Sequence, residues 1–288
     1  MIASRRALLA SLLGALALLG CDDGAPPSST TRSEPWTADP AVLRIAGTGT
    51  GIPLVARLAD AWNARSVGLP VVVEPSVGST GGIRAARDGA GDLGLSARPL
   101  SPSEQGEGLR ALPLARDAVV VAVHPATRVR DISSAALVEL LAGRSSRFAD
   151  GTPATVLLRD RDDTAHSALE RMIPALHPAR EQAYAHKRFR VLLHDDAMGE
   201  AISSTPGALG PFSLGAIVAS RLPLEVLAID GVRPTLAALE EGRWPAARDL
   251  SFVVRTDREA RVAPFLSFVA GADGQRMIRE AGYLPVPP

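Results

Sequence analysis

Three short stretches of the sequence combine glycine, hydroxyl side chains and arginine in a pattern that could hold an anion. They read AGTGTGIPL at 46–54, VGSTGGI at 77–83 and LLRDRDDTAHSALE at 157–170. Each follows an apolar segment typical of a strand and precedes a predicted helix. A helix start carries free N–H groups and a partial positive charge, and glycine lets the backbone come close to a ligand. Together the three stretches predict a site for a small oxyanion.

The candidate contacts are amides, hydroxyls and one guanidinium, which are all hydrogen-bond donors. Arginine adds a planar fork that matches two oxygens of a tetrahedral ion. The candidates are Thr50 and Gly51 in the first stretch, Ser79, Thr80 and Gly81 in the second, and Arg159 and Thr164 in the third. For each stretch the alternative is plain helix capping, because Ser and Thr are preferred at the start of any helix.

Motifs of common enzymes do not fit these stretches. In AGTGTGIPL the third glycine of a dinucleotide-binding loop would fall on Ile52, and neither glycine-rich stretch ends like a P-loop. The sequence also lacks Gly-x-Ser-x-Gly and His-Glu-x-x-His, and its five histidines are scattered. His166 lies two residues after Thr164, where a solvated helix position is the stronger interpretation than catalysis. We therefore expect a binding protein that is not an enzyme and uses no cofactor and no metal.

The overall charge argues against a nucleic-acid partner. The chain has 31 basic and 31 acidic residues, a formal net charge of zero. A protein that neutralises many phosphates of a nucleic acid needs a surplus of basic residues.

The N-terminal residues read as a targeting segment. Arg5 and Arg6 precede the apolar residues 7–20, which are too few for a comfortable membrane span and have the layout of a secretory signal. The segment ends in Leu-Leu-Gly-Cys at Cys21, the single cysteine of the chain, and this ending resembles a bacterial lipobox. The resemblance implies cleavage before Cys21 and a lipid on its sulfur, with Asp22 favouring retention at the inner membrane. The alternative is an unmodified cysteine after an ordinary signal.

The rest of the chain alternates β-branched runs with amphipathic helices, which is the α/β pattern. Residues 22–39 are rich in Pro, Ser and Thr and predict a flexible tether. Strands are expected at 43–46, 71–74, 117–125, 155–158 and 190–193. Residues 92–100 are expected to form a strand and its exit loop, and residues 165–176 a helix. About 250 residues remain after the tether, enough for one large domain or two ordinary ones.

The order of the motifs resembles the phosphate-binding proteins of bacterial ABC phosphate importers, in the type II periplasmic binding protein superfamily. The similar segments are AGTGTGIPLVARLADAW, GSTGGI, GDLGLSARPLS, TPGALGPFSLGAI and FLSFVAGADGQRMIREAGYLPVP. The resemblance implies two α/β lobes, joined by two crossing strands, that close over a dehydrated anion. It matches Thr50 with the Gly51 amide to the first anion loop and Ser79 to the hydroxyl donor of the second. It also matches Arg159 to the anion-pairing arginine and Thr164 to the threonine that closes the third loop.

Two positions depart from the phosphate-binding pattern. The family has an aspartate after the serine of the third-strand motif, where it accepts a proton from phosphate; this chain has Ala97 there, followed by Arg98. The third loop reads Asp162-Asp163-Thr164 instead of Gly-Ser-Gly-Thr. Either aspartate is a candidate replacement acceptor, and Arg98 is a candidate second cation beside the ligand. The alternatives are a loop cap for the aspartates and a surface position for Arg98.

These observations predict a signal peptide at 1–21, a tether at 22–39, a first lobe at 40–118 plus 250–288 and a second lobe at 119–249. The expected protein is a monomer, anchored by lipid on the periplasmic side of the cytoplasmic membrane. It would deliver a tetrahedral oxyanion, phosphate first, to an ABC permease. The alternatives are an anion-sensing lipoprotein with a membrane signalling partner, a binder of sulfate, molybdate or tungstate, and a surface interaction module that binds no oxyanion.

Overall fold

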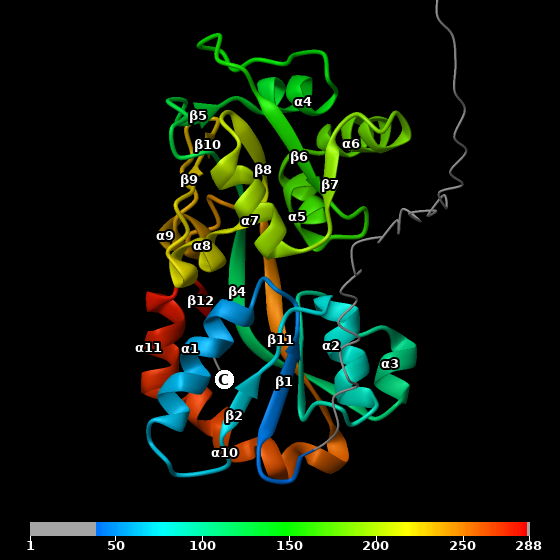
Figure 1. The fold of residues 1–288 in the computed structure, drawn as a ribbon, viewed down its shortest axis with the longest axis vertical. Coiled ribbons are helices and arrows are strands. Elements are labelled where there is room, and N and C mark those ends of the chain that lie inside the picture. The colour runs from blue at the N-terminus through cyan, green and yellow to red at the C-terminus, as the bar shows by residue number, and fades with distance from the viewer. Residues whose placement is uncertain (1–38, 287–288) are drawn as a thin grey trace, which may run out of the picture. The chain divides into compact units, whose positions relative to one another are not determined.

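The computed structural model describes residues 39–286, which lie within one compact unit (Figure 1). The first part of the chain forms β1 (Leu43–Gly47), α1 (Ile52–Asn63), β2 (Val71–Val73), α2 (Gly78–Arg87), β3 (Leu93–Ser96), α3 (Pro102–Gly106) and β4 (Leu109–Val123). The middle part forms β5 (Asp131–Ile132), α4 (Ser134–Leu141), β6 (Thr155–Arg159), α5 (Thr164–Met172), α6 (Leu176–Ala185), β7 (Arg190–Leu192), α7 (Asp195–Ser204), β8 (Ala208–Ser213), α8 (Leu214–Ser220), β9 (Glu225–Val226), β10 (Ala228–Ile229) and α9 (Leu236–Glu240). The last part forms β11 (Ala247–Arg255), a 3₁₀ turn (Thr256–Arg258), α10 (Glu259–Ala270), α11 (Ala272–Glu280) and β12 (Leu284–Pro285).

One sheet runs through both lobes of the fold, in the order β2-β1-β3-β11-β4-β8-β6-β7. In the first lobe β1 pairs in parallel with β2 and β3, and in the second lobe β6 pairs in parallel with β7 and β8. The two lobes are joined by the long antiparallel pair β4 and β11, seen side by side in the middle of Figure 1. In such sheets, ligands bind beyond the carboxyl ends of the parallel strands.

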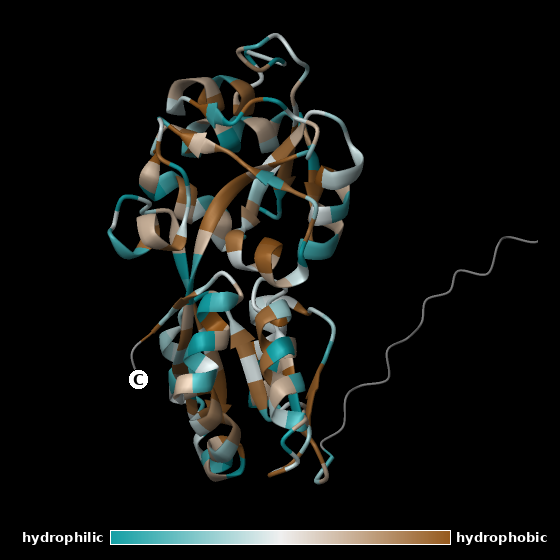
Figure 2. Cartoon of the chain, turned by 90° about the vertical axis from the view of Figure 1, so that its left-hand side faces the viewer, coloured by the Kyte–Doolittle hydropathy of each residue, from teal (hydrophilic) through white to brown (hydrophobic). Residues whose placement is uncertain are grey.

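Each lobe has its own main hydrophobic core, and a smaller third cluster lies under α2. One core is built from strands β1 and β3 with α1 and α10; there Trp62 packs on Phe265 and Phe268 with ring centroids 5.9 and 5.7 Å apart. The other core is built around the buried run Val119–Val123 of β4 and the strands and helices between β4 and β11. Figure 2 shows apolar residues concentrated on the strands and polar residues on the outer helix faces. Nearly continuous apolar strands are expected where helices cover both faces of a sheet.

The glycine-rich stretch at 77–83 forms the start of α2, and Gly82 lets this helix lie directly on the sheet. A methyl group at Gly82 would lie 2.6 Å from the Cα of Gly47 and 2.7 Å from the carbonyl oxygen of Ala46. Gly78 opens the helix with φ +71°, a left-handed conformation that favours glycine. Glycine is therefore needed here for the backbone path and for helix–sheet contact.

The helix predicted over 165–176 is wrong in its extent. Helix α5 ends at Met172, and α6 begins separately at Leu176. Pro174 explains the break, because the residue before a proline is driven out of the helical region. Ile173 accordingly has φ −131° and ψ 85°.

Candidate functional site

A cavity of about 330 Å³ lies at the carboxyl ends of parallel strands from both lobes. The first lobe contributes the segments after β1 and β2, and the second lobe contributes those after β6 and β7. Its lining residues are Thr48, Ser76, Val77, Gly78, Ser79, Thr80, Arg98, Arg159, Asp160, Asp162, Asp163, Thr164, Leu193, His194, Asp195 and Arg248. The starts of α2, α5 and α7 therefore meet at one cavity.

The start of α2 offers donors that no side chain caps. Its N-cap residue, Val77, makes no side-chain cap hydrogen bond, so the first-turn amides are left for another acceptor. The Ser79 hydroxyl accepts a hydrogen bond from the Ala97 N–H at 3.0 Å, which fixes the oxygen and leaves its proton to donate elsewhere. Because Ser79 lines the cavity, that proton can serve a ligand oxygen.

Arg159 supplies the cation of the site. The side chain is buried at the end of β6, and its Nε and Nη2 lie 2.9 and 2.8 Å from Oδ2 of Asp163. Nη2 also lies 3.5 Å from Oδ2 of Asp195. Nη1 is buried and has no hydrogen-bond partner among the described residues. A buried unpaired guanidinium nitrogen is costly, so this donor is suited to a ligand oxygen.

Asp163 acts as a cap and as a counter-ion. Its Oδ1 accepts from the Ala165 N–H at 2.9 Å, which caps α5, while its other oxygen binds Arg159. Burial alone would raise the pKa of Asp163, but Arg248 and Arg159 outweigh burial and hold it below its usual value. Asp163 is therefore ionised at neutral pH and occupied by protein donors.

Arg248 links the cavity to the strands that join the lobes. It lies on β11, where its Nε donates to Oδ2 of the buried Asp117 at 3.2 Å and its Nη1 lies 3.3 Å from the Thr164 hydroxyl oxygen. Asp117 also accepts from the Ser213 hydroxyl at 2.8 Å. Burial opposes the charge of Arg248, but the surrounding carboxylates outweigh it and raise its pKa. Arg248 was not predicted from the sequence; the one signal for a buried cation was Asp117, a carboxylate at the start of an apolar strand.

Asp195 also lines the cavity without having been predicted from the sequence. It is the first residue of α7, whose N-cap His194 makes no side-chain cap hydrogen bond. A methyl group at Gly49 would lie 2.5 Å from Oδ2 of Asp195, so this second-lobe carboxylate lies directly against the β1–α1 loop of the first lobe. Asp195 and Asp196, two adjacent aspartates after a short strand, are only weak evidence for a binding site, because acidic residues are stabilising at the start of any helix.

The structure brings together six of the nine predicted contact residues. Ser79, Thr80, Arg98, Arg159, Asp163 and Thr164 line the cavity, as does the candidate acceptor Asp162. Arg98 is not a free cation, because its guanidinium pairs with both oxygens of Glu104 at 2.9 and 2.8 Å. This pairing lowers the pKa of Glu104 to about 2.

The other three predicted residues, Thr50, Gly51 and Gly81, do not line the cavity. Thr50 is buried, and its carbonyl oxygen accepts from the Tyr283 hydroxyl at 2.6 Å. In the first stretch it is Thr48, two residues earlier, that faces the cavity. The glycine-rich loop turns before the helix begins, so the position of its hydroxyls could not be read from the spacing.

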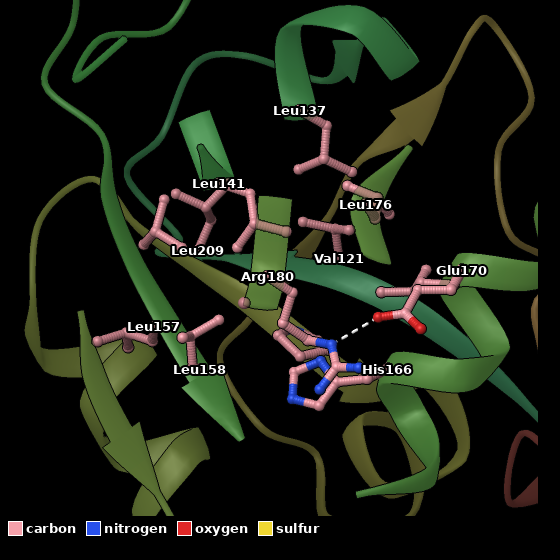
Figure 3. Close-up of a pocket in the computed structure, with 14 residues that line it drawn as sticks. Val121, Leu137, Leu141, Leu157, Leu158, His166, Glu170, Leu176, Arg180 and Leu209 are labelled. Atoms are coloured by element: carbon pink, nitrogen blue, oxygen red, sulfur yellow. Dashed lines mark hydrogen bonds and ion pairs between the residues drawn. The ribbon is translucent and has the colours of Figure 1, made fainter. Parts of the chain in front are cut away.

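His166 lies in the second lobe, on α5, with its Nε2 3.4 Å from the carbonyl oxygen of Arg159. It is buried; its Nε2 lies 3.0 Å from the Tyr184 hydroxyl, which donates to the carbonyl oxygen of Arg159. Burial, and secondarily Arg180, lowers the pKa of His166, so the ring is neutral at physiological pH. Figure 3 shows His166 with Arg180 and Glu170 at one side of a small cavity that is otherwise lined by leucines and other apolar residues. The solvated position expected for His166 is therefore wrong.

Two absences apply to residues 39–286. Within them no cluster of His, Cys, Asp or Glu is arranged to hold a metal ion. The same residues include no helix with the length and apolarity needed to cross a bilayer. Cys21 and the rest of the predicted signal and tether lie outside the described residues, except Asp39.

Two α/β lobes around a cleft that gathers helix starts, hydroxyls and a buried arginine define a solute-binding protein. The chain belongs to the PBP superfamily: the family model described as "PBP superfamily domain" matches residues 26–273. This match confirms the predicted superfamily and fold class. The curated relatives found are named as binding proteins, which agrees with the expectation that the chain is not an enzyme.

Curated relatives carry the name phosphate-binding protein. The chain is 22% identical to phosphate-binding protein PstS of Borreliella burgdorferi over 252 residues, which is 85% of this chain and 90% of that protein. It is 28% identical to phosphate-binding protein PstS 2 of Streptococcus agalactiae over 106 residues, which span 37% of this chain and 36% of that protein.

Solved structures share the fold at low identity. A Clostridium perfringens protein solved with bound phosphate has a TM-score of 0.71 at 16% identity, covering 85% of this chain and 99% of that chain. An ABC-type phosphate transport receptor from Vibrio cholerae has a TM-score of 0.60 at 19% identity, covering 85% and 100%.

Proposed function

We propose that this protein is an extracytoplasmic solute-binding protein that captures phosphate in the cleft between its lobes. The observation that carries the proposal is the buried Arg159 nitrogen Nη1, which lacks a partner among the described residues and belongs to a side chain that lines the cavity. The uncapped start of α2 and the Ser79 proton add neutral donors from the opposite lobe. The names of the relatives, and the phosphate bound in a similar structure, support the same ligand.

The charges of the cavity favour an oxyanion that carries a proton. Arg159 and Arg248 are paired with the carboxylates of Asp163 and Asp195 at the cavity and, behind it, with that of the buried Asp117. An unprotonated dianion such as sulfate would be repelled by these carboxylates in a partly dry site. Phosphate retains a proton at neutral pH and can donate it to a carboxylate.

Asp195 is the best-placed acceptor for that proton. Asp163 already binds Arg159 and caps α5, whereas Asp195 lies at 3.5 Å from Arg159 with no helix-cap contact of its own. We therefore propose that Asp195 replaces the carboxylate that is missing at Ala97, in preference to the earlier candidates Asp162 and Asp163.

Capture is proposed to proceed by closure of the lobes about β4 and β11, with no covalent step. The two cores separate between Ala115 and Ala118 and between Ala246 and Leu250, so we place the lobe boundaries there, close to the predicted 118/119 and 249/250. The second lobe would bring Arg159 and Thr164 onto an anion already held by Ser79 and the α2 amides.

The finer parts of the proposal concern the membrane and the partner. We propose that Cys21 carries a lipid that holds the protein on the periplasmic side of the cytoplasmic membrane, and that an ABC permease receives the anion. Loss of the protein from the membrane fraction in a Cys21→Ser variant, and co-purification of a permease with the wild type, are the expected results.

The test of the ligand is a thermal-shift screen of the purified protein with phosphate, sulfate, molybdate and tungstate. A ligand that binds the native state alone must raise the melting temperature. We expect phosphate to give the largest rise, and Arg159→Lys to reduce that rise relative to its own ligand-free melting temperature. If none of the four oxyanions changes the melting temperature, the proposed function is wrong.

A further inference from the structure

Arg248 is a buried cation at the anion cavity whose role the proposed function leaves open. It lies on β11 directly opposite Asp117 of β4, on the two strands that join the lobes, and both side chains are buried. A buried ion pair contributes little net stability by itself, because desolvation of the two charges offsets their attraction. The other contacts of Arg248 therefore bear on what it does.

The guanidinium of Arg248 reaches from these strands to the start of α5. Its Nη1 donates to the Thr164 hydroxyl oxygen at 3.3 Å and lies 3.5 Å from Oδ1 of Asp163, and all three residues line the anion cavity. On its other side, Nε donates to Asp117 at 3.2 Å, and the Ser213 hydroxyl in turn donates to Asp117 at 2.8 Å. The guanidinium is thus fixed between the joining strands and the loop that follows β6.

The contact with Arg248 determines how the Thr164 hydroxyl can donate. A hydroxyl oxygen that accepts an N–H directs its own proton elsewhere, and the hydrogen bonds within residues 39–286 include no acceptor for the Thr164 proton. Because Thr164 lines the cavity, this proton can serve a ligand oxygen. Ser79 is prepared in the same way on the opposite lobe, where the Ala97 N–H donates to its hydroxyl. Each lobe therefore presents one oriented hydroxyl donor to the cavity.

Arg248 also offsets the charge of Asp163. Burial raises the pKa of Asp163, whereas Arg248 and then Arg159 lower it. Without Arg248, the carboxylate would depend on Arg159 alone, and the guanidinium that the anion needs would be more fully neutralised.

We propose that Arg248 is a positioning residue for anion capture, which acts through Thr164 by fixing its hydroxyl as a donor to the bound anion. This inference rests on the proposed function, because it concerns the same site. It adds to that function a residue on the joining strands that prepares the second lobe for the ligand.

A double-mutant cycle on phosphate affinity, measured by isothermal titration, tests this role. Its four proteins are the wild type, Thr164→Val, Asp117→Asn/Arg248→Gln and the combination of all three substitutions. Changing Asp117 together with Arg248 keeps the net charge of the site and leaves neither partner as an unpaired buried charge.

The expected effects follow from one hydrogen bond to a charged group. Thr164→Val should weaken phosphate binding by about ten- to hundredfold in the wild-type background. Asp117→Asn/Arg248→Gln should weaken it by at least about tenfold, and Thr164→Val should then add less than about threefold, because the hydroxyl is no longer oriented.

Arg261→Gln is the matched control for loss of stability. Arg261 lies on α10, donates to Asp92 at 2.8 Å and to three carbonyl oxygens within residues 39–42, and does not line the anion cavity. Its variant should have a lower melting temperature and the phosphate affinity of the wild type. A purely structural role for Arg248 would give the same result in Asp117→Asn/Arg248→Gln.

The outcomes separate this inference from the proposed function. If the wild type binds phosphate but Thr164→Val or Asp117→Asn/Arg248→Gln binds it equally well, or if the two effects multiply independently, the inference is wrong and the proposed function stands. If the wild type binds no phosphate, the proposed function itself fails. Should Asp117→Asn/Arg248→Gln not fold, Arg248→Lys replaces it in the cycle with the same expectation, because lysine keeps the charge beside Asp117 and lacks the fork that also reaches Thr164.

Discussion

Replacing Asp195 with asparagine should change which oxyanion the cleft prefers more than whether an oxyanion binds. The substitution keeps the size of the side chain and removes its charge. The carboxylate lies 3.5 Å from Nη2 of Arg159 and directly against the loop at Gly49, so it faces the proposed anion cavity from the start of α7. An amide in the same place can donate to an unprotonated oxygen, which the carboxylate cannot do.

The size of the effect follows from the charges. Two unit charges 4 Å apart interact by about 4 kcal/mol near a protein surface, so a carboxylate strongly opposes an unprotonated dianion. A hydrogen bond from a protonated phosphate to that carboxylate contributes about 1.5–3 kcal/mol. Asparagine relieves the repulsion and weakens the bond. Because each 1.4 kcal/mol is a factor of ten, the ratio of phosphate to sulfate affinity should fall by about a hundredfold or more.

Titration calorimetry with phosphate and with sulfate at neutral pH measures this ratio. Asp196→Asn is the matched control, since Asp196 is the next residue of the same helix start, and its carboxylate accepts from the Ala197 N–H at 2.8 Å outside the cavity lining. The control should keep the wild-type ratio. An Asp195→Asn variant that binds phosphate and still rejects sulfate would refute the assignment of the proton acceptor.

Four further changes test the parts that hold the site. Arg159→Lys keeps the charge and loses the planar fork, so calorimetry should show phosphate affinity lower by at least about tenfold; an unchanged value would remove this arginine from the site. Tyr184→Phe removes the donor to the Arg159 carbonyl, which should lower the free energy of unfolding in urea by about 1 kcal/mol and weaken phosphate binding, whereas a purely local role would spare binding. Gly82→Ala should cost about 1–3 kcal/mol in the same assay, because its methyl group would lie 2.6 Å from the Cα of Gly47. Glu104→Gln should destabilise the protein at neutral pH, and the difference from wild type should shrink as pH falls from 4.5 toward about 2, since ionised Glu104 stabilises the fold above that range; a constant difference would contradict this.

The fold was predictable because its signals are local and repeated. Buried parallel strands read as short apolar runs, and each is followed by a helix that opens with small polar residues. The strand expected at 43–46 is β1, and the one expected at 155–158 is β6, each extended by one residue. The predicted extent of the helix over 165–176 failed because periodicity was followed across Pro174, whose ring ended the helix.

The site was only partly predictable, because it depends on contacts between distant segments. Arg248 reaches the Thr164 hydroxyl across 84 residues, and Asp195 reaches Gly49 from the other lobe. The spacing of residues within one stretch cannot predict contacts between segments that lie far apart in the sequence. Thr48 lines the cavity in place of the predicted Thr50 for a different reason. A glycine-rich loop can turn in several ways before its helix begins, so the sequence does not show which hydroxyl faces the cavity.

The position of β11 in the sheet also determines when each lobe can fold. Strand β11 lies between β3 and β4, and α10 packs its Phe265 against Trp62 of α1, so the first lobe needs residues from both ends of the chain. The second core draws on residues 118–246, which are contiguous. As the chain emerges from its N-terminal end, the second lobe can therefore form its core from contiguous residues, whereas the first lobe cannot be completed until β11 and α10 have emerged.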